Sequence, residues 1–110
     1  QVNICLNYGG RDEILRAAKA YANDCIEGKA DPNHLTEGQF SEYLFSRGVP
    51  DPDLIIRPSG EIRTSNFLLW QSAYAEYYFT DVLWPEFDRN ELCKALASYQ
   101  KRSRRFGGVK

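Results

Sequence analysis

The chain has 110 residues and a formal net charge of −1, with 43% hydrophobic, 14% aromatic and 26% charged residues. This length fits one folding unit over residues 1–110, and the composition excludes a disordered chain and a fibrous repeat. Because no run of about 18 apolar residues and no basic, apolar leader is present, we expect neither a membrane span nor a signal peptide. The three cysteines have no paired spacing, which favours buried thiols in a reducing cytoplasm over disulfides or a zinc site.

The first elements in chain order are a predicted strand and a predicted helix. Residues 2–7 form an almost continuous apolar run, typical of a strand buried on both faces, and the glycine pair at 9–10 favours a tight turn after it. Apolar residues at helical spacing then predict a helix over residues 11–27. Gly28 stands where a C-terminal cap belongs.

A polar loop and a short helix complete the first half of the chain. Residues 31–34 read as a loop, and we expect His34 to be solvated there, since no cysteine or second histidine is placed to help it bind a metal. Thr36 and Gln39 have the spacing of a capping box. This spacing predicts a short helix that runs to about Ser46.

The second half contains two further predicted strands and two further helices. Residues 53–57 read as a buried strand that ends on an arginine, and residues 58–61 form a turn or loop. The stretch 67–75 looks like a helix with apolar residues almost all around it, and the aromatic residues of 76–80 favour a third strand. Asp88 and Glu91 then have capping spacing before a helix that continues towards Arg105, with glycines after it.

Buried strands that alternate with helices indicate an α/β fold with a mostly parallel sheet flanked by helices. Three strands with so few helices leave at least one sheet face and one edge uncovered. We therefore expect another part of a larger protein to cover them, and we interpret the chain as a fragment.

The charge is distributed unevenly along the chain. Residues 101–110 hold five basic residues and no acidic residue, whereas the first hundred hold nine basic and fifteen acidic residues. Such a tail attracts an anion such as a phosphate, a lipid head group or a nucleic acid. The alternative is a solvated basic helix end that the helix dipole favours.

The segment after the second predicted strand has the composition of an anion site. In open α/β sheets the ligand binds beyond the carboxyl ends of the strands. Arg57 and Arg63 flank a loop of small residues, and Ser65 precedes a predicted helix, so two guanidinium groups, a hydroxyl and helix amides could converge on a phosphate. Alternatively, Arg57 pairs with Asp53 or Glu61 and Ser65 only caps the helix.

Glu76 is the strongest candidate for a metal ligand. It lies between an apolar segment and an aromatic strand, where an unpaired buried charge would be costly. A diphosphate usually arrives with a divalent cation, which requires carboxylate oxygens. The partner of Glu76 is therefore an arginine, in a structural role, or a metal ion.

The stretch DLIIRPSGEIRTSNFLLWQSAYAEYYFTDVLWPEFD resembles the C-terminal signature of the cis-prenyltransferases, among them undecaprenyl diphosphate synthase. NYGGRDEI near the start and RSRRFGG near the end resemble further segments of that family in the same order. The resemblance covers almost the whole chain but only the C-terminal half of the enzyme. It implies a homodimer of α/β subunits that condenses isopentenyl diphosphate with an allylic diphosphate, with Mg²⁺ as cofactor. The product is a polyprenyl diphosphate, a lipid carrier for cell-wall synthesis.

The resemblance also implies roles for individual residues. The diphosphate of isopentenyl diphosphate would be bound by Arg57, Arg63, Thr64 and Ser65. Glu76 occupies the position of a Mg²⁺ ligand. Arg105 and Gly107 match a tail motif that reaches across the dimer to the partner's substrate site. Glu13 and Glu61 align with acidic positions that support substrate or metal binding, or that form structural ion pairs. No residue of the chain is assigned as catalytic.

Two positions depart from the family pattern. Pro58 stands where many members have threonine, and Ile62 stands where some have a histidine that also approaches the metal, which leaves the metal coordination open. The family's N-terminal segment, which binds the allylic diphosphate, is absent from this chain, so we expect the fragment alone to be inactive.

The alternative function is a noncatalytic partner subunit of a heteromeric prenyltransferase. Partner-type relatives tend to lose the residues that correspond to Arg57, Arg63 and Ser65, so their presence here favours the catalytic class. A nucleic-acid partner is not expected, because no recognition motif is present and the sequence pI is about 5.8. The expected location is the cytoplasm, at the membrane surface where the product would associate.

Overall fold

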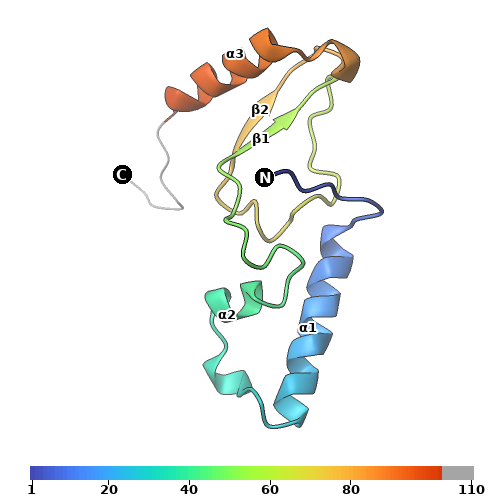
Figure 1. The fold of residues 1–110 in the computed structure, drawn as a ribbon, viewed down its shortest axis with the longest axis vertical. Helices are drawn as coiled ribbons and strands as arrows, with labels where there is room; N and C mark the ends of the chain where they lie inside the picture. Colours follow the sequence, from blue (N-terminus) through green and yellow to red (C-terminus); the bar gives the residue numbers. More distant parts are fainter. Residues whose placement is uncertain (103–110) are drawn as a thin grey trace. The chain divides into compact units, whose positions relative to one another are not determined.

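The computed structural model of the protein describes residues 1–102. Among the described residues the chain divides into two compact units, of which the first contains residues 1–50 and 66–70 and the second contains residues 51–65 and 71–102. The first unit is helical, whereas the second holds the sheet and one further helix (Figure 1). The expectation of one folding unit over residues 1–110 stays a prediction.

Helix α1, Gly10–Ile26, confirms the first predicted helix (Figure 1). Its buried side chains recur every fourth residue and so form one stripe along the helix: Glu13, Ala17 and Tyr21. Gly28 follows with φ 79°, a left-handed conformation that glycine adopts without steric cost, so its role at the end of the helix is as predicted.

Helix α2, Glu37–Ser41, is shorter than the sequence indicates. The capping box is confirmed, since Thr36 Oγ1 accepts from the Gln39 amide at 3.1 Å and Gln39 Oε1 accepts from the Thr36 amide at 3.2 Å. The expected extent to Ser46 is wrong. After Ser41 the chain tightens into hydrogen bonds between residues three apart, which form successive turns instead of an α-helix.

Aromatic contacts hold the first unit together. The rings of Tyr21 on α1 and Tyr43 after α2 meet edge to face with centroids 5.4 Å apart. Phe40 lies 4.9 Å from the ring of Trp70, whose indole N–H donates to Ser41 Oγ at 3.0 Å. These contacts connect α2 to residues that are distant in sequence.

Residues 2–7 do not form the buried strand that their apolar composition predicts. Val2, Ile4 and Leu6 are 86%, 79% and 83% exposed. A strand requires a hydrogen-bonded neighbour, and none of the described strands pairs with this segment. The prediction of buried thiols is also incorrect, because Cys5 and Cys93 are exposed and Cys25 is half-buried.

The second unit contains a parallel pair of strands, β1 (Leu54–Arg57) and β2 (Glu76–Phe79). Leu54 pairs with Glu76 and Arg57 with Phe79. The residues of β1 are half-buried, whereas the sequence predicts a strand buried on both faces, and in β2 the first three residues are half-buried and Phe79 is exposed. Parallel strands together with α-helices make the fold α/β, which confirms the predicted fold class.

The predicted helix over residues 67–75 is absent, and turns take its place. Asn66 and Leu68 have φ values of 66° and 47°. These values belong to the left-handed region, which a right-handed helix cannot include. Ser65 therefore does not cap a helix.

Helix α3, Arg89–Gln100, begins at the predicted cap, where the Asp88 carboxylate accepts from the Glu91 amide at 3.0 Å. It ends at Gln100, earlier than the predicted continuation towards Arg105, which lies outside the described residues. Just beyond the helix, the Arg102 guanidinium donates to the Tyr77 carbonyl oxygen at 2.5 Å. This bond ties the end of α3 to β2.

Among residues 1–102, no helix is both long and apolar enough to cross a membrane.

Candidate functional site

Arg57 ends β1, at the edge of the sheet where the sequence predicts an anion site. Its guanidinium donates to the carbonyl oxygen of Arg63 at 2.8 Å, so it ties the two ends of the loop 57–63 together. The alternative partner Glu61 is bound elsewhere, because its carboxylate forms an ion pair with Arg63. The Arg57 guanidinium therefore holds the loop in shape, and the Arg63 guanidinium is paired with the Glu61 carboxylate in the same loop.

The rest of the loop 57–65 is fixed at its start and open at its end. The Ser59 amide donates to the Val82 carbonyl at 2.8 Å, and the Ser59 hydroxyl accepts from the Trp84 amide at 3.0 Å. Arg63 keeps 62% of its side-chain surface exposed, and Thr64 and Ser65 are exposed as well. Guanidinium and hydroxyl donors thus face solvent on one short segment, where an anion can reach them.

The helix amides that were expected to assist this site are not available. The anion interpretation included the N-terminus of a helix after Ser65, but residues 65–74 form turns and bends. The contribution of a helix dipole to phosphate binding is therefore removed from the prediction. Arginine and hydroxyl groups remain as the donors of the loop.

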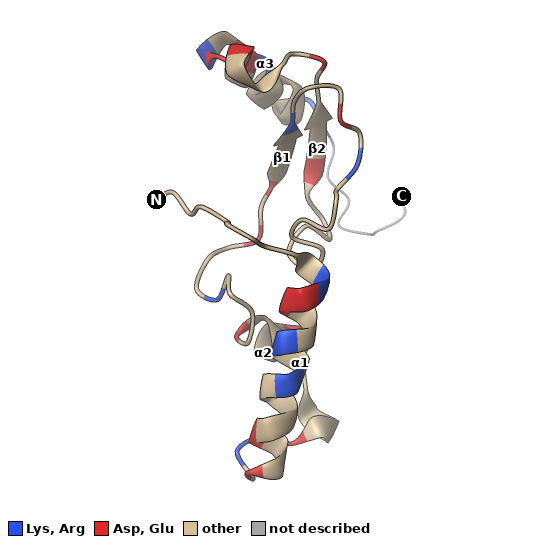
Figure 2. Ribbon diagram, turned by 90° about the vertical axis from the view of Figure 1, so that its right-hand side faces the viewer, with Lys and Arg blue, Asp and Glu red and all other residues tan. Residues whose placement is uncertain are grey.

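Glu76 begins β2 opposite Leu54, whereas Arg57 lies opposite Phe79 at the other end of the strand pair (Figure 2). Three residues along a parallel strand correspond to about 10 Å. Because β1 and β2 are parallel, the connection after Arg57 must return towards the start of β2. At the start of this connection the Arg57 guanidinium keeps the backbone of Arg63 within hydrogen-bond distance, at 2.8 Å.

The Glu76 side chain is half-buried, and within residues 1–102 it has no hydrogen-bonded or ionic partner. The arginine partner considered from the sequence is thus not found in this part of the chain. No cluster of three or more histidine, cysteine, aspartate or glutamate side chains occurs among the described residues. Glu76 is therefore a single carboxylate. Ile62, which stands where some family members have a histidine near the metal, offers only an apolar side chain that is 70% exposed in the loop.

The tail residues assigned from the resemblance, Arg105 and Gly107, lie outside the described residues. Glu13, aligned with an acidic position of the family, is 2% exposed within the first unit. Its carboxylate accepts from the Tyr8 hydroxyl and from the Phe45 amide, the latter at 2.7 Å. Burial and the hydrogen bond to Glu13 raise the pKa of Tyr8, so the Tyr8 hydroxyl keeps its proton and remains a donor at neutral pH.

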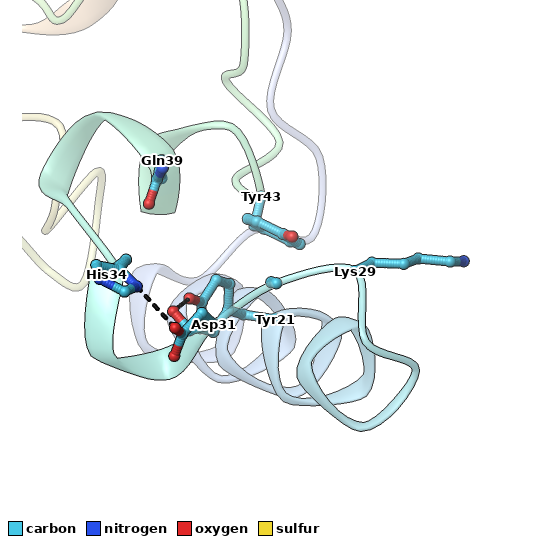
Figure 3. Close-up of a pocket in the computed structure, with 7 residues that line it drawn as sticks. Tyr21, Lys29, Asp31, His34, Gln39 and Tyr43 are labelled. Atoms are coloured by element: carbon cyan, nitrogen blue, oxygen red, sulfur yellow. Dashed lines mark hydrogen bonds and ion pairs between the residues drawn. The ribbon is translucent and has the colours of Figure 1, made fainter.

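A cavity of about 330 Å³ lies in the first unit (Figure 3). Its polar groups already bind one another: the Tyr21 hydroxyl donates to the Asp31 carbonyl at 2.7 Å, and His34 Nδ1 lies 2.7 Å from Asp31 Oδ2. Tyr43 likewise donates to Asp24 at 2.5 Å. His34 is exposed, as expected. Since these groups satisfy each other, the cavity offers few unused donors to a ligand.

Sequence comparison gives the broader context for these residues. A model of the Prenyltransf family, described as undecaprenyl diphosphate synthase, matches residues 1–107. The chain belongs to this prenyltransferase family. The isoprenyl transferase of Heliobacterium mobile is 57% identical to it over 109 residues, which are 99% of this chain and 42% of that protein. A tritrans,polycis-undecaprenyl-diphosphate synthase (geranylgeranyl-diphosphate specific) of Thermoplasma volcanium is 55% identical, over 96% of this chain and 41% of its own length.

A solved structure agrees with the fold as well. The lavandulyl diphosphate synthase from Lavandula x intermedia, in complex with dimethylallyl diphosphate, superposes with a TM-score of 0.89 at 42% identity. The match covers 94% of this chain and 44% of that chain. The chain thus spans about two fifths of the length of its relatives and is a fragment by comparison with them.

One residue of interest escaped the sequence interpretation. Asn66, directly after the predicted site, accepts hydrogen bonds from the amides of Gly10 and Arg11. The sequence predicts only a tight turn at the glycine pair 9–10. The sequence signal is the glycine pair at the start of the predicted helix. Neither glycine has a side chain that could cap the helix, and both leave room for another segment to approach the backbone closely.

Proposed function

We propose that this chain is the isopentenyl-diphosphate-binding part of a cis-prenyltransferase. In the reaction of the whole enzyme, a new carbon–carbon bond joins isopentenyl diphosphate to an allylic diphosphate, diphosphate leaves the allylic partner, and a proton is lost. The observation that carries the proposal is the loop 57–65, which holds two arginines and three hydroxyl side chains between the strands of a prenyltransferase-family sheet.

The roles follow from the contacts of each side chain. Arg57 holds the loop through the Arg63 carbonyl, so we assign it both to loop shape and to one phosphate contact. Arg63 would exchange its exposed ion pair with Glu61 for the more highly charged diphosphate. Thr64 and Ser65 would donate hydroxyl hydrogen bonds. None of these residues needs to take a proton, so their work is binding and orientation.

Mg²⁺ is the cofactor that we propose, and Glu76 is the residue that would hold it. The donor set fits this cation, because Mg²⁺ retains several waters and needs only one or two carboxylates in addition to substrate phosphates. A half-buried carboxylate without a partner in residues 1–102 supports this assignment. When bound, Mg²⁺ would neutralise diphosphate charge and so assist the departure of the leaving group.

Several features of the whole enzyme belong to the same proposal. They are a homodimer in which Arg105 and Gly107 reach the partner's substrate, a cytoplasmic location at the membrane surface, and a polyprenyl product that associates with the membrane. The fragment alone would be inactive, because the family resemblance assigns the allylic site to an N-terminal segment and this chain matches only 42% of the Heliobacterium mobile protein. The alternative is a noncatalytic subunit of a heteromeric prenyltransferase.

Calorimetric titration of the 110-residue chain with isopentenyl diphosphate tests the proposal. We expect Arg63→Ala to weaken binding by roughly 1.5 to 3 kcal/mol, about tenfold or more, because a charge-assisted contact is lost. Arg16→Ala is the matched control, since Arg16 also forms an exposed ion pair and its side chain is 66% exposed against 62% for Arg63. Equal losses in the two variants would contradict the assignment of the loop.

A chimaera separates the two functions. Residues 1–110 would replace the matching segment of the Heliobacterium mobile isoprenyl transferase, to which they are 57% identical. A catalytic chain should support chain elongation from an allylic diphosphate in this setting, and Arg63→Ala should abolish most of it. A chimaera that folds and dimerises but makes no product would favour the noncatalytic subunit.

A further inference from the structure

Helix α1 has no capping side chain of its own. Its N-cap residue is Gly9, in an extended conformation with φ −146° and ψ 131°. The first amides of a helix have no partner within the helix, so an acceptor must reach them from elsewhere. In α1 the acceptors come from one residue far along the chain.

Asn66 supplies both acceptors. Its carbonyl oxygen accepts from the Gly10 amide at 2.7 Å, and its Oδ1 accepts from the Arg11 amide at 2.9 Å. Asn66 and Arg11 are 55 positions apart in sequence. The side chain of Asn66 thus caps α1 in the way that a local N-cap residue would, while its backbone is anchored at the same place.

The glycine pair makes this approach possible. A Cβ atom on Gly9 would lie 2.9 Å from Asn66 Nδ2, closer than side-chain carbons are normally found. A Cβ atom on Gly10 would lie 2.8 Å from Leu69 Cγ and 3.1 Å from the Asn66 carbonyl oxygen. Residues 9–10 therefore form a close-fitting receptor for residues 66–69, beyond the tight turn that the sequence suggests.

The backbone around Asn66 needs such an anchor. Ser65, Asn66 and Leu68 have φ values of 49°, 66° and 47°. Left-handed conformations at residues other than glycine persist only where surrounding contacts hold them, although asparagine tolerates them better than most residues. The two hydrogen bonds to α1 are contacts of this kind.

We propose that Asn66 is a positioning residue, which fixes the end of the substrate loop 57–65 by anchoring the next residue to the start of α1. Ser65 is covalently bonded to Asn66, so an anchored Asn66 restricts the backbone and hydroxyl of Ser65. A ligand then binds an ordered loop and avoids part of the entropy cost of ordering it. The ligand in this inference rests on the proposed function, whereas the anchoring itself does not.

Two substitutions at position 66 separate the cap from the backbone conformation. Asn66→Gly keeps access to positive φ but removes Oδ1, whereas Asn66→Asp keeps an acceptor at the same position. NMR on the 110-residue chain would measure exchange of the Arg11 amide, order parameters of the Thr64 and Ser65 amides, and the affinity for isopentenyl diphosphate. In Asn66→Gly we expect roughly fivefold faster Arg11 exchange, lower order parameters and weaker binding, and in Asn66→Asp little change.

Gly9→Ala tests the same anchor without altering residue 66. Its Cβ would displace the Asn66 amide group, whereas the control Gly38→Ala introduces a Cβ that meets nothing within 4 Å. Gly9→Ala should therefore lower the order of Thr64 and Ser65, and Gly38→Ala should not. If Asn66→Gly fails to fold, the comparison of Gly9→Ala with Gly38→Ala still tests whether the anchor at Asn66 orders Thr64 and Ser65.

The outcomes are distinct. If Arg11 loses protection while Thr64 and Ser65 keep their order, Asn66 only caps the helix and the positioning role is overturned. If the unmodified chain does not bind isopentenyl diphosphate, the proposed ligand fails, and the order parameters still decide the anchor. Loss of order with unchanged affinity would overturn the contribution to binding.

Discussion

At the residue scale, Glu76 is the side chain whose proposed role can be tested most directly. If it binds Mg²⁺, the cation should strengthen the binding of isopentenyl diphosphate by this chain. Glu76→Gln keeps the shape of the side chain but removes its charge, so we expect it to abolish most of the effect of Mg²⁺ while the affinity without metal changes little. Titrations with and without Mg²⁺ measure both quantities.

The control for Glu76 is Glu86→Gln, which removes one negative charge from an exposed residue of the 3₁₀ turn Trp84–Glu86. It changes the net charge of the chain by the same amount. If Mg²⁺ strengthens binding equally in both variants and in the unmodified chain, Glu76 has only a structural role.

Tyr43 predicts how stability depends on pH. Its hydrogen bond to Asp24, followed by desolvation, raises its pKa to about 12. Because the folded-state pKa lies above the ordinary value of 10.0, the folded chain holds this proton more tightly than the unfolded chain. Its contribution to stability is therefore complete below pH 10 and is lost as pH rises towards 12. Tyr43→Phe should flatten the fall in melting temperature over this range.

The control is Tyr78→Phe, which removes a hydroxyl from a half-buried side chain of β2. The raised pKa values of Tyr8 and Tyr21 contribute slopes of the same sign, so Tyr43→Phe should reduce the slope without removing it. A melting curve whose alkaline slope is the same in Tyr43→Phe and in the unmodified chain would refute the role given to this tyrosine.

At the element scale, the helices with local signals were predictable. The capping pair Thr36 and Gln39, the cap at Asp88 and the glycine after α1 act within a few residues, so the sequence contains everything they need. The extents of α2 and α3 were less predictable. Their C-termini lack a strong local stop signal, and both end earlier than the apolar pattern indicates.

Two predicted elements do not form, and in both cases the reason lies outside the local sequence. The apolar run at residues 2–7 has strand composition, but a strand exists only with a paired neighbour. Residues 67–75 have helical composition, yet Asn66 is drawn into a left-handed conformation by hydrogen bonds to α1. Local pattern cannot reveal either effect, because the deciding contact is absent in the first case and 55 residues away in the second.

The candidate site was predicted in part by the same logic. The composition of residues 53–57 predicts a strand that ends at Arg57, and β1 does end at this residue. The distribution of contacts within the loop does not follow, since the sequence allowed Arg57 to pair with Glu61 and the structure pairs Arg63 with that residue. Neither result tests what the loop binds.

At the scale of the whole molecule, the described chain buries little apolar surface. The buried hydrophobic residues among residues 1–102 are Ala17, Tyr21, Leu44 and Ala95. Many large apolar side chains are exposed instead, and three of them stand at positions 2, 4 and 6 of one short segment. Exposed apolar patches of this kind usually mark an interaction surface. The relatives contain more than twice the length of this chain, which supplies a candidate for what covers it.

We therefore expect residues 2–6 to be protected by the part of a relative that this chain does not span. Coexpression of the chain with the remaining three fifths of the Heliobacterium mobile isoprenyl transferase should give a complex that melts at a higher temperature than the chain alone. Ile4→Ser should weaken this complex, because it places a hydroxyl in the buried apolar contact. Ile26→Ser is the matched control, since Ile26 is 83% exposed against 79% for Ile4 but lies at the end of α1. Size-exclusion chromatography and thermal melts measure assembly, and equal assembly of both variants would show that the segment 2–6 is not part of the contact.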